Sequence, residues 1–312
     1  MSLDTFSTTW RQVLLRCPAA SVFLAQGWVK YAFRRVAERR RWSWLIKPNQ
    51  FIINKVVTAG AVALTRNSPT VTGAGTAFTL AMVGRQFRAS ANFPIYTITD
   101  VDVGAQTLTL DQVWGGTTES SVGYELYNAY VTPPTDFHAF ISVTDPAFNW
   151  QLNLNIGQDE LNAVDAQRTD SGTVYIVAWR DYDSRFTPPL PRYELWPHQK
   201  ADYVYPYLYE ARATDLDDAN AQLPRFIRGD MLLEFALVEC ARWPGPSKEQ
   251  PNPYFNLALA REHERRAELM VMEAEKQDDE TFLQDARYMT ATGLPFAPLP
   301  WGDSQWLQSH SI

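Results

Sequence analysis

The spacing of apolar residues changes twice along the chain, and these changes constrain the fold more than any other feature. In the first 50 residues, apolar side chains recur at steps of three and four, the spacing of amphipathic helices. From 51 to 180 the spacing becomes two, in short runs rich in Val, Thr, Ile and Tyr, which predicts β-strands. The helical spacing returns after Tyr209. The sequence therefore predicts an α+β fold, with a small all-β domain, a barrel or a sandwich, inserted into a helical domain that both chain ends form.

The same changes predict the domain boundaries. Prolines and tyrosines without clean periodicity fill Arg185–Tyr209, so we expect an ordered, extended crossover there. The expected segments are the first part of the helical domain at 1–50, the inserted β domain at 51–180, the crossover at 181–209, the second part of the helical domain at 210–289 and an extended C-terminal arm at 290–312.

Three residues predict helix starts in the helical domain. Ser21 is a suitable N-cap, because its hydroxyl can accept a hydrogen bond from the first turn. Pro224 suits the first position of a second helix. Asn252 is expected to cap a long last helix that ends near Met289.

Composition excludes several classes of protein. The net charge of −7 argues against a protein that grips nucleic acid by neutralising phosphates. No apolar run is long enough to span a bilayer, and the first residues do not have the pattern of a secretory signal, so we expect synthesis in a cytoplasm. Cys17 and Cys240 lie in segments predicted to be helical, so free, buried thiols are expected.

Catalytic and metal-binding motifs are incomplete. His263 and Glu264 begin a zinc-protease motif, but Ala267 occupies the position of the second histidine. Neighbouring carboxylates could in principle form a hydrolase pair, although such residues are more often helix starts or solvated side chains. They are Asp159, Glu160, Asp215, Asp217 and Asp218. We therefore expect no catalytic residue, no metal and no cofactor, and interpret the protein as not an enzyme.

Two aromatic segments suggest docking surfaces. The first is a basic run at the end of the second helix followed by two tryptophans, Arg34, Arg35, Arg39, Arg40, Arg41, Trp42 and Trp44. A solvated helix end and a nucleic-acid patch are the alternatives for the arginines, and a core position is the alternative for both tryptophans. The second segment is the Pro-rich arm, whose Phe296, Trp301 and Trp306 have no core of their own.

Several stretches, taken in order, resemble the head-to-tail connector, or adaptor, proteins of tailed bacteriophages. They are WRQVLLRCP with VKYAFRRVAERRRWSW, TVTGAGTAFTLAMVGRQFR with YTITDVDVGAQTLTLDQVW, YVYPYLY, and LPRFIRGDMLLEFALVECARWPG with NPYFNLALAREHERR. The resemblance implies a helical body with an inserted β domain and an arm that reaches the portal protein. It also implies a homo-oligomeric ring, commonly of about twelve subunits in short-tailed phages, that carries the tail nozzle or tail tube. The family has no defined catalytic residues, and the long insertion from Phe51 to Arg180 departs from its smaller members.

The resemblance leads us to expect a structural virion protein in the neck or tail. It would dock on the portal, join it to the tail and line the channel through which genomic DNA passes during ejection, without sequence-specific binding. Acidic residues that interrupt the last helix's apolar stripe are the expected channel-facing groups, namely Glu273, Glu275, Asp278, Asp279 and Glu280. The alternative is a tail-associated cell-wall hydrolase or carbohydrate-binding protein, in which Trp114 and Tyr124 bind sugar.

Overall fold

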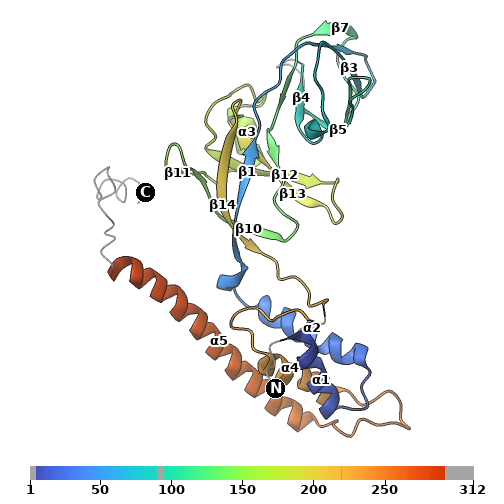
Figure 1. Ribbon diagram of the computed structural model, residues 1–312, viewed down its shortest axis with the longest axis vertical. Coiled ribbons are helices and arrows are strands. Elements are labelled where there is room, and N and C mark those ends of the chain that lie inside the picture. The colour runs from blue at the N-terminus through green and yellow to red at the C-terminus, as the bar shows by residue number, and fades with distance from the viewer. Residues whose placement is uncertain (1–4, 90–93, 219, 292–312) are drawn as a thin grey trace. The chain divides into compact units, whose positions relative to one another are not determined.

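The computed structural model describes residues 5–89, 94–218 and 220–291, with side chains up to residue 280 (Figure 1). It combines α-helices with antiparallel sheets, so the fold is α+β. The chain divides into two compact units. We call residues 1–46 with 212–312 the helical unit, and residues 47–211 the β unit. None of the helices in the described part of the chain could cross a membrane.

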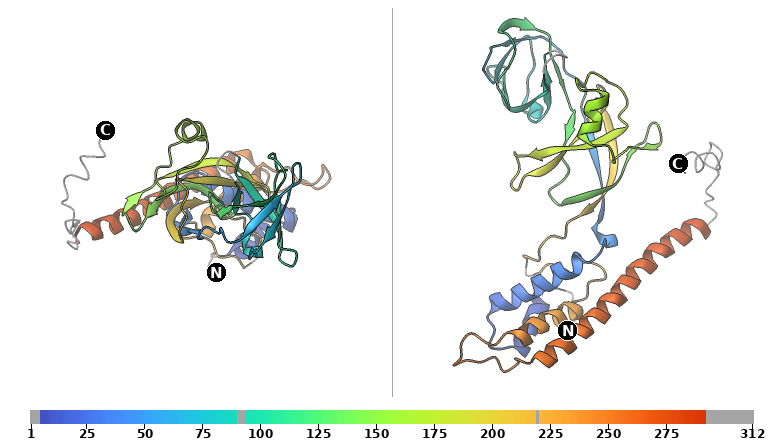
Figure 2. Two further views of the ribbon diagram at one scale, coloured as in Figure 1. Left: turned by 90° about the horizontal axis from the view of Figure 1, so that it is seen from above. Right: turned by 180° about the vertical axis from the view of Figure 1, so that it is seen from behind.

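The helical unit is built around α4 (Gly229–Arg242). This helix packs against α1 (Phe6–Arg16), α2 (Val22–Ala37) and α5 (Leu257–Ala291), and it lies between α2 and α5 in both figures (Figures 1 and 2). Its central position explains why it is apolar on almost all sides, since ten of its fourteen residues are buried. The shared core includes Val29, Phe33, Trp42, Leu232, Phe235 and Val271.

Helix α2 begins as predicted, whereas the other two helices begin later. The Ser21 hydroxyl accepts a hydrogen bond from the amide of Leu24 at 3.2 Å. The prediction for Pro224 is wrong, because the left-handed backbone of Phe226 (φ 71°) prevents a helix from running through it. Helix α4 therefore starts only at Gly229.

Asn252 does not cap the last helix, so that prediction is also wrong. Its Nδ2 instead donates to the carbonyl oxygens of Cys240 and Trp243, each at 2.8 Å, and ties the end of α4 to the following loop. The cap is Asn256, whose Oδ1 accepts hydrogen bonds from two amides of the first turn of α5. Cys17 and Cys240 are free and fully buried, as expected.

The described residues of the β unit form three antiparallel sheets (Figures 1 and 2). The largest has the order β7-β2-β3-β6-β5-β4-β8. Its strands are β2 (Ala61–Leu64), β3 (Thr70–Ala74), β4 (Gln86–Arg88), β5 (Tyr96–Asp102), β6 (Thr107–Leu110), β7 (Glu119–Val122) and β8 (Glu125–Tyr127). Alternate side chains such as Leu64, Ile98 and Leu108 fill its core, as the period of two predicted.

Two smaller sheets complete the β unit. One has the order β1-β14-β10-β11 and the other β12-β13-β9. Their strands are β1 (Ile46–Ile53), β9 (Tyr130–Val131), β10 (Phe137–Asp145), β11 (Trp150–Gln151), β12 (Ile176–Asp183), β13 (Leu190–Trp196) and β14 (Tyr203–Ala211), and α3 (Gln158–Val164) precedes β12.

The expected crossover at 181–209 is the largest difference from the predicted organisation. This segment holds the end of β12, all of β13 and most of β14, so it belongs to the sheets. In β14 the rings of Tyr205, Tyr207 and Tyr209 are buried at alternate positions, which is strand periodicity. Prolines obscured that pattern in the sequence. They fit because the residue before a proline prefers extended backbone.

Candidate functional site

The basic end of α2 lies against α5, where its arginines form ion pairs with the acidic residues of that helix. Arg35 Nη2 lies 2.9 Å from Glu268 Oε1, and Arg39 Nε lies 2.9 Å from Glu275 Oε1. Arg40 Nη2 lies 2.5 Å from Asp279 Oδ1, about one helical turn further along α5. Residues that the sequence assigned to separate docking and channel surfaces are therefore partners of each other within one chain.

Asp278 is the most buried of these acidic residues, with 2% of its surface exposed. It accepts a hydrogen bond from the amide of Ser43 at 3.2 Å and another from the Ser43 hydroxyl, and Arg40 Nη2 lies 3.6 Å away. It continues the buried face of α5, which consists of Ala260, His263, Ala267, Val271, Ala274 and Asp278. Asp278 thus holds the turn after α2 within the chain, and the expectation that it faces a channel is corrected.

The other acidic residues expected to face a channel remain more open. Glu273 is exposed and lies 3.9 Å from Arg228. Glu280 is also exposed and lies 3.7 Å from Lys276. Asp279 is exposed apart from its contact with Arg40.

The tryptophans beside the basic run belong to the core or its edge. Trp42 is 0% exposed, and its Nε1 donates to the carbonyl oxygen of Val36 at 2.9 Å. Trp44 is half-buried, with its ring centroid 6.3 Å from that of Phe33. Trp42 therefore takes the core position that was the alternative to docking. Arg41 is exposed, and Arg34 pairs with Asp215 at 2.7 Å between Nε and Oδ1.

The suspected catalytic groups occupy structural positions. Asp159 and Glu160 lie in the first turn of α3, where they complement the helix dipole. Asp217 pairs with Lys30. His263 is buried, with Nδ1 2.6 Å from Glu234 Oε2 and Nε2 2.7 Å from the Tyr254 hydroxyl. In the described residues no group of His, Cys, Asp and Glu could hold a metal ion.

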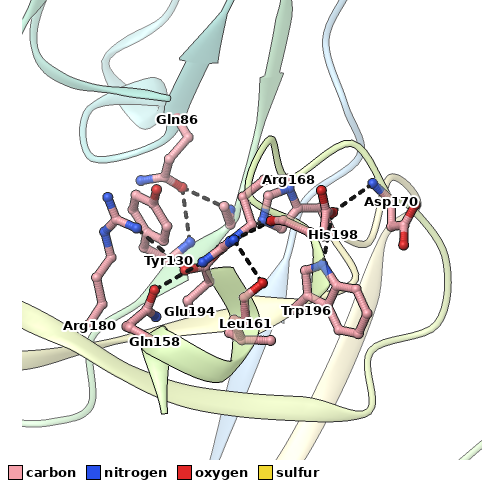
Figure 3. A network of polar contacts seen from close by, with 12 residues as sticks. Gln86, Tyr130, Gln158, Leu161, Arg168, Asp170, Arg180, Glu194, Trp196 and His198 are labelled. Carbon is pink, nitrogen blue, oxygen red and sulfur yellow. Dashed lines mark hydrogen bonds and ion pairs between the residues drawn. The ribbon is translucent and has the colours of Figure 1, made fainter. Parts of the chain in front are cut away.

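A buried polar network in the β unit was not predicted (Figure 3). Glu194 on β13 is 0% exposed, and its Oε1 accepts a hydrogen bond from Arg168 Nε at 2.6 Å. Arg180 Nη1 lies 3.4 Å from the other oxygen, and His198 Nε2 lies 3.5 Å from Oε1, near the limit of a hydrogen bond. Burial opposes ionisation, but contacts with His198 and Arg168 outweigh it and lower the pKa of Glu194 to about 2.

All three nitrogens of the Arg168 side chain donate hydrogen bonds. Its Nη2 donates to Gln158 Oε1 at 3.1 Å and to Asn162 Oδ1 at 2.7 Å, and its Nη1 donates to two backbone carbonyls. Its own carbonyl accepts from Arg88 Nη1 on β4 at 2.6 Å. The network therefore joins α3, the sheet that contains β13 and the largest sheet.

The residues assigned to sugar binding are buried, so this assignment is wrong. Trp114 and Tyr124 are 1% and 4% exposed and pack in the core of the largest sheet. Exposed aromatic pairs occur elsewhere in the β unit. Phe148 and Trp150 stack with their ring centroids 5.1 Å apart, and Trp179 and Tyr182 meet edge to face at 5.9 Å.

Large apolar side chains are also exposed on the helical unit. Phe23 on α2 is 83% exposed, and Tyr31 lies two turns further along the same helix. Leu269 and Met272 are exposed on α5. The predicted docking residues Phe296, Trp301 and Trp306 lie outside the described residues. No protein-family model matches the chain, and no curated protein is significantly similar to it.

Proposed function

We propose that this chain is a structural virion protein of a tailed bacteriophage, a ring-forming adaptor between portal and tail. The observation that carries the proposal is a pair of apolar surfaces on the small helical unit. One includes Phe23 and its neighbour Val22 at the start of α2, and the other includes Leu269 and Met272 on α5. Helix α4 lies between the two helices (Figures 1 and 2).

Two different apolar surfaces on one subunit suit a heterologous assembly. In such an assembly each copy uses one surface toward the preceding neighbour and the other toward the next, and the chain of contacts closes into a ring. Exposed apolar side chains of this size favour protein contacts, because their burial is worth about 1.5–3 kcal/mol each. The order of segments, with helices from both chain ends and an inserted β unit, also agrees with the resemblance to adaptor proteins.

The experiment is to measure the mass of the purified full chain in solution, alone and with its portal, by light scattering. The ring proposal expects a closed oligomer for the natural sequence. Phe23→Ser and Leu269→Ser should each lower the mass, because each removes one of the two surfaces. Phe148→Ser is the matched control, since it removes an exposed aromatic from the β unit. A monomer at all concentrations, with or without portal, would refute the proposal.

Portal docking is assigned to the arm at 290–312 and is tested separately. Deleting 290–312 should leave the circular dichroism of the chain unchanged and abolish its attachment to portals. Equal attachment of the truncated and full chains would remove the docking role of the arm while leaving the ring intact.

The negative charge of the protein supports the proposed channel lining. Exposed carboxylates such as Glu273 and Glu280, together with the net charge of −7, would repel DNA phosphates and let the genome slide. Charge reversal of both residues to lysine should slow genome ejection without changing ring mass, since added cations bind phosphates. Unchanged ejection kinetics would remove these two residues from the channel.

Carbohydrate binding is a second candidate, favoured by the exposed aromatic pairs of the β unit. The Phe148–Trp150 and Trp179–Tyr182 pairs present apolar ring faces of the kind that stack on sugars. Sedimentation of the protein with purified peptidoglycan, followed by assay of released sugar, tests this candidate. Binding that Trp179→Ala weakens would support it, whereas absence of both binding and hydrolysis would exclude it.

A further inference from the structure

A hollow of about 350 Å³ in the β unit is lined by an arginine whose charge has no carboxylate partner among the residues that the structure describes. Arg85 follows the turn before β4 and is 7% exposed. Its hydrogen bonds run from Nη2 to the carbonyl oxygens of Asn54, Lys55 and Leu126, the shortest at 2.7 Å to Lys55. These dipoles solvate the guanidinium only in part, since its buried Nε has no acceptor among the described residues.

The charge of Arg85 is therefore uncompensated by a neighbouring anion. Burial lowers the pKa of Arg85, and the more distant charge of Asp202 opposes this only in part, since no carboxylate of the described residues forms an ion pair with Arg85. Elsewhere in the β unit the buried guanidinium of Arg168 is paired with Glu194. A buried charge without a counter-ion is costly, and an anion from solution would remove much of that cost.

A second guanidinium lines the same hollow. Arg185 binds both oxygens of Asp183 through Nε and Nη2, which leaves Nη1 outside that pair. Nη1 lies against Gly84, the residue directly before Arg85. Glycine is required here, because φ is +86° and a Cβ would overlap Nη1. The backbone thus brings the guanidinium of Arg185 close to the chain position of Arg85.

Neutral donors complete the lining. Asn128 Oδ1 accepts from the amide of Asn54 at 3.2 Å, and its Nδ2 has no acceptor in the described part of the chain. Tyr130 also lines the hollow, and its ring lies under the guanidiniums of Arg180 and Arg192, with centroid distances of 4.0 and 5.2 Å. Each of these cations is paired with a carboxylate, Arg180 with Glu194 and Arg192 with Asp181, so the donors of the hollow itself carry the argument.

We propose that this hollow binds a small oxyanion, a phosphate or a carboxylate, through Arg85, Arg185 and Asn128. Guanidinium and amide N–H groups are donors only, and the planar fork of arginine matches the oxygens of both ligand types. The site is independent of the proposed assembly, because every residue in it belongs to the β unit.

Calorimetric titration of the full chain with inorganic phosphate and, separately, with acetate tests the site, at constant ionic strength with chloride as the reference anion. Arg185→Gln should weaken binding about tenfold, because one charged hydrogen-bond donor is lost. Arg66→Gln is the matched control, since it removes an exposed positive charge from the same unit outside the hollow. Binding of phosphate alone assigns the site to phosphate groups, and equal binding of acetate assigns it to carboxylates.

A second pair of variants tests the hollow without changing Arg85, because substitution of a buried residue can unfold the protein. Ala81 is exposed at the edge of the hollow, so Ala81→Glu places a carboxylate there that should compete with added anion, whereas Ala81→Gln should not. Loss of phosphate or acetate binding in Ala81→Glu alone supports the site. Absence of binding by the natural chain, or equal binding by Arg185→Gln and Arg66→Gln, would overturn it.

Discussion

Asp278 accepts hydrogen bonds from both the backbone amide and the hydroxyl of Ser43, and this pair joins α5 to the turn that follows α2. The two residues are 235 positions apart in the chain. The contact lies where the basic end of α2 meets the acidic part of α5, so it fixes the register between these helices. Charges that looked like surface features in the sequence are therefore part of the internal structure of the helical unit.

We predict that Asp278→Ala lowers the free energy of unfolding of the helical unit by about 2–3 kcal/mol. The substitution leaves the Ser43 amide without its acceptor and removes a carboxylate beside Arg40. Urea denaturation followed by far-UV circular dichroism measures the change. Glu280→Ala is the matched control, and it should have almost no effect because Glu280 is exposed. Equal losses in the two variants would contradict the prediction.

Acid should weaken the β unit through Glu194. Its pKa is lowered from the ordinary 4.5 to about 2, so the native state stays ionised where the unfolded chain binds a proton. The resulting stability, on the order of 3 kcal/mol, is fully present above about pH 4.5 and is lost as the pH falls toward 2.

The test compares the natural chain with Glu194→Gln in urea at several pH values. The variant should be less stable near neutral pH, because Arg168 then lacks its carboxylate, and the difference should shrink in acid. Glu125→Gln is the control, since the pair of Glu125 with Lys200 is exposed on both sides and contributes little. Parallel pH profiles for the natural chain and Glu194→Gln would contradict the assignment.

Local signals predicted the parts of the fold that depend on neighbouring residues. The Ser21 cap involves a residue three positions away, and the strands around Leu64 and Ile98 follow from alternation within a few residues. Prolines hid the same alternation in β14, so a strand was interpreted as a crossover. For that reason the predicted end of the inserted β domain, at residue 180, falls before the end of the β unit at Ala211.

Contacts between side chains that lie far apart in the chain were not predictable from the sequence. Asp278 was interpreted as an interruption because its partner Ser43 lies far away in the chain, although it falls on the spacing of Val271 and Ala274. Arg168 and Glu194 gave no local signal, because their pairing depends on how the loop after α3 lies against β13. Trp42 was ambiguous because one sequence pattern suits both a core position and a docking position.

Both cysteines should resist labelling in the native state. Cys17 and Cys240 are fully buried, and burial raises the pKa of the Cys240 thiol, so its reactive thiolate is scarce. Reaction with a chromogenic disulfide reagent should be absent without denaturant and should modify two thiols per chain in urea. The urea dependence of labelling should follow loss of helical signal. Rapid reaction of either thiol in the native protein would contradict this.

Two glycines should respond to alanine in opposite directions. Gly27 lies within α2 and a Cβ there would meet nothing within 4 Å, so Gly27→Ala should stabilise the helical unit by up to about 1 kcal/mol. Gly84 has φ +86° and lies against Arg185, so Gly84→Ala should destabilise the β unit by at least about 1 kcal/mol. Thermal unfolding measures both changes. Combining Gly84→Ala with Arg185→Ala should recover the steric part of the loss and leave the backbone part; a loss that is unchanged in this double variant would show that Arg185 does not pack on Gly84.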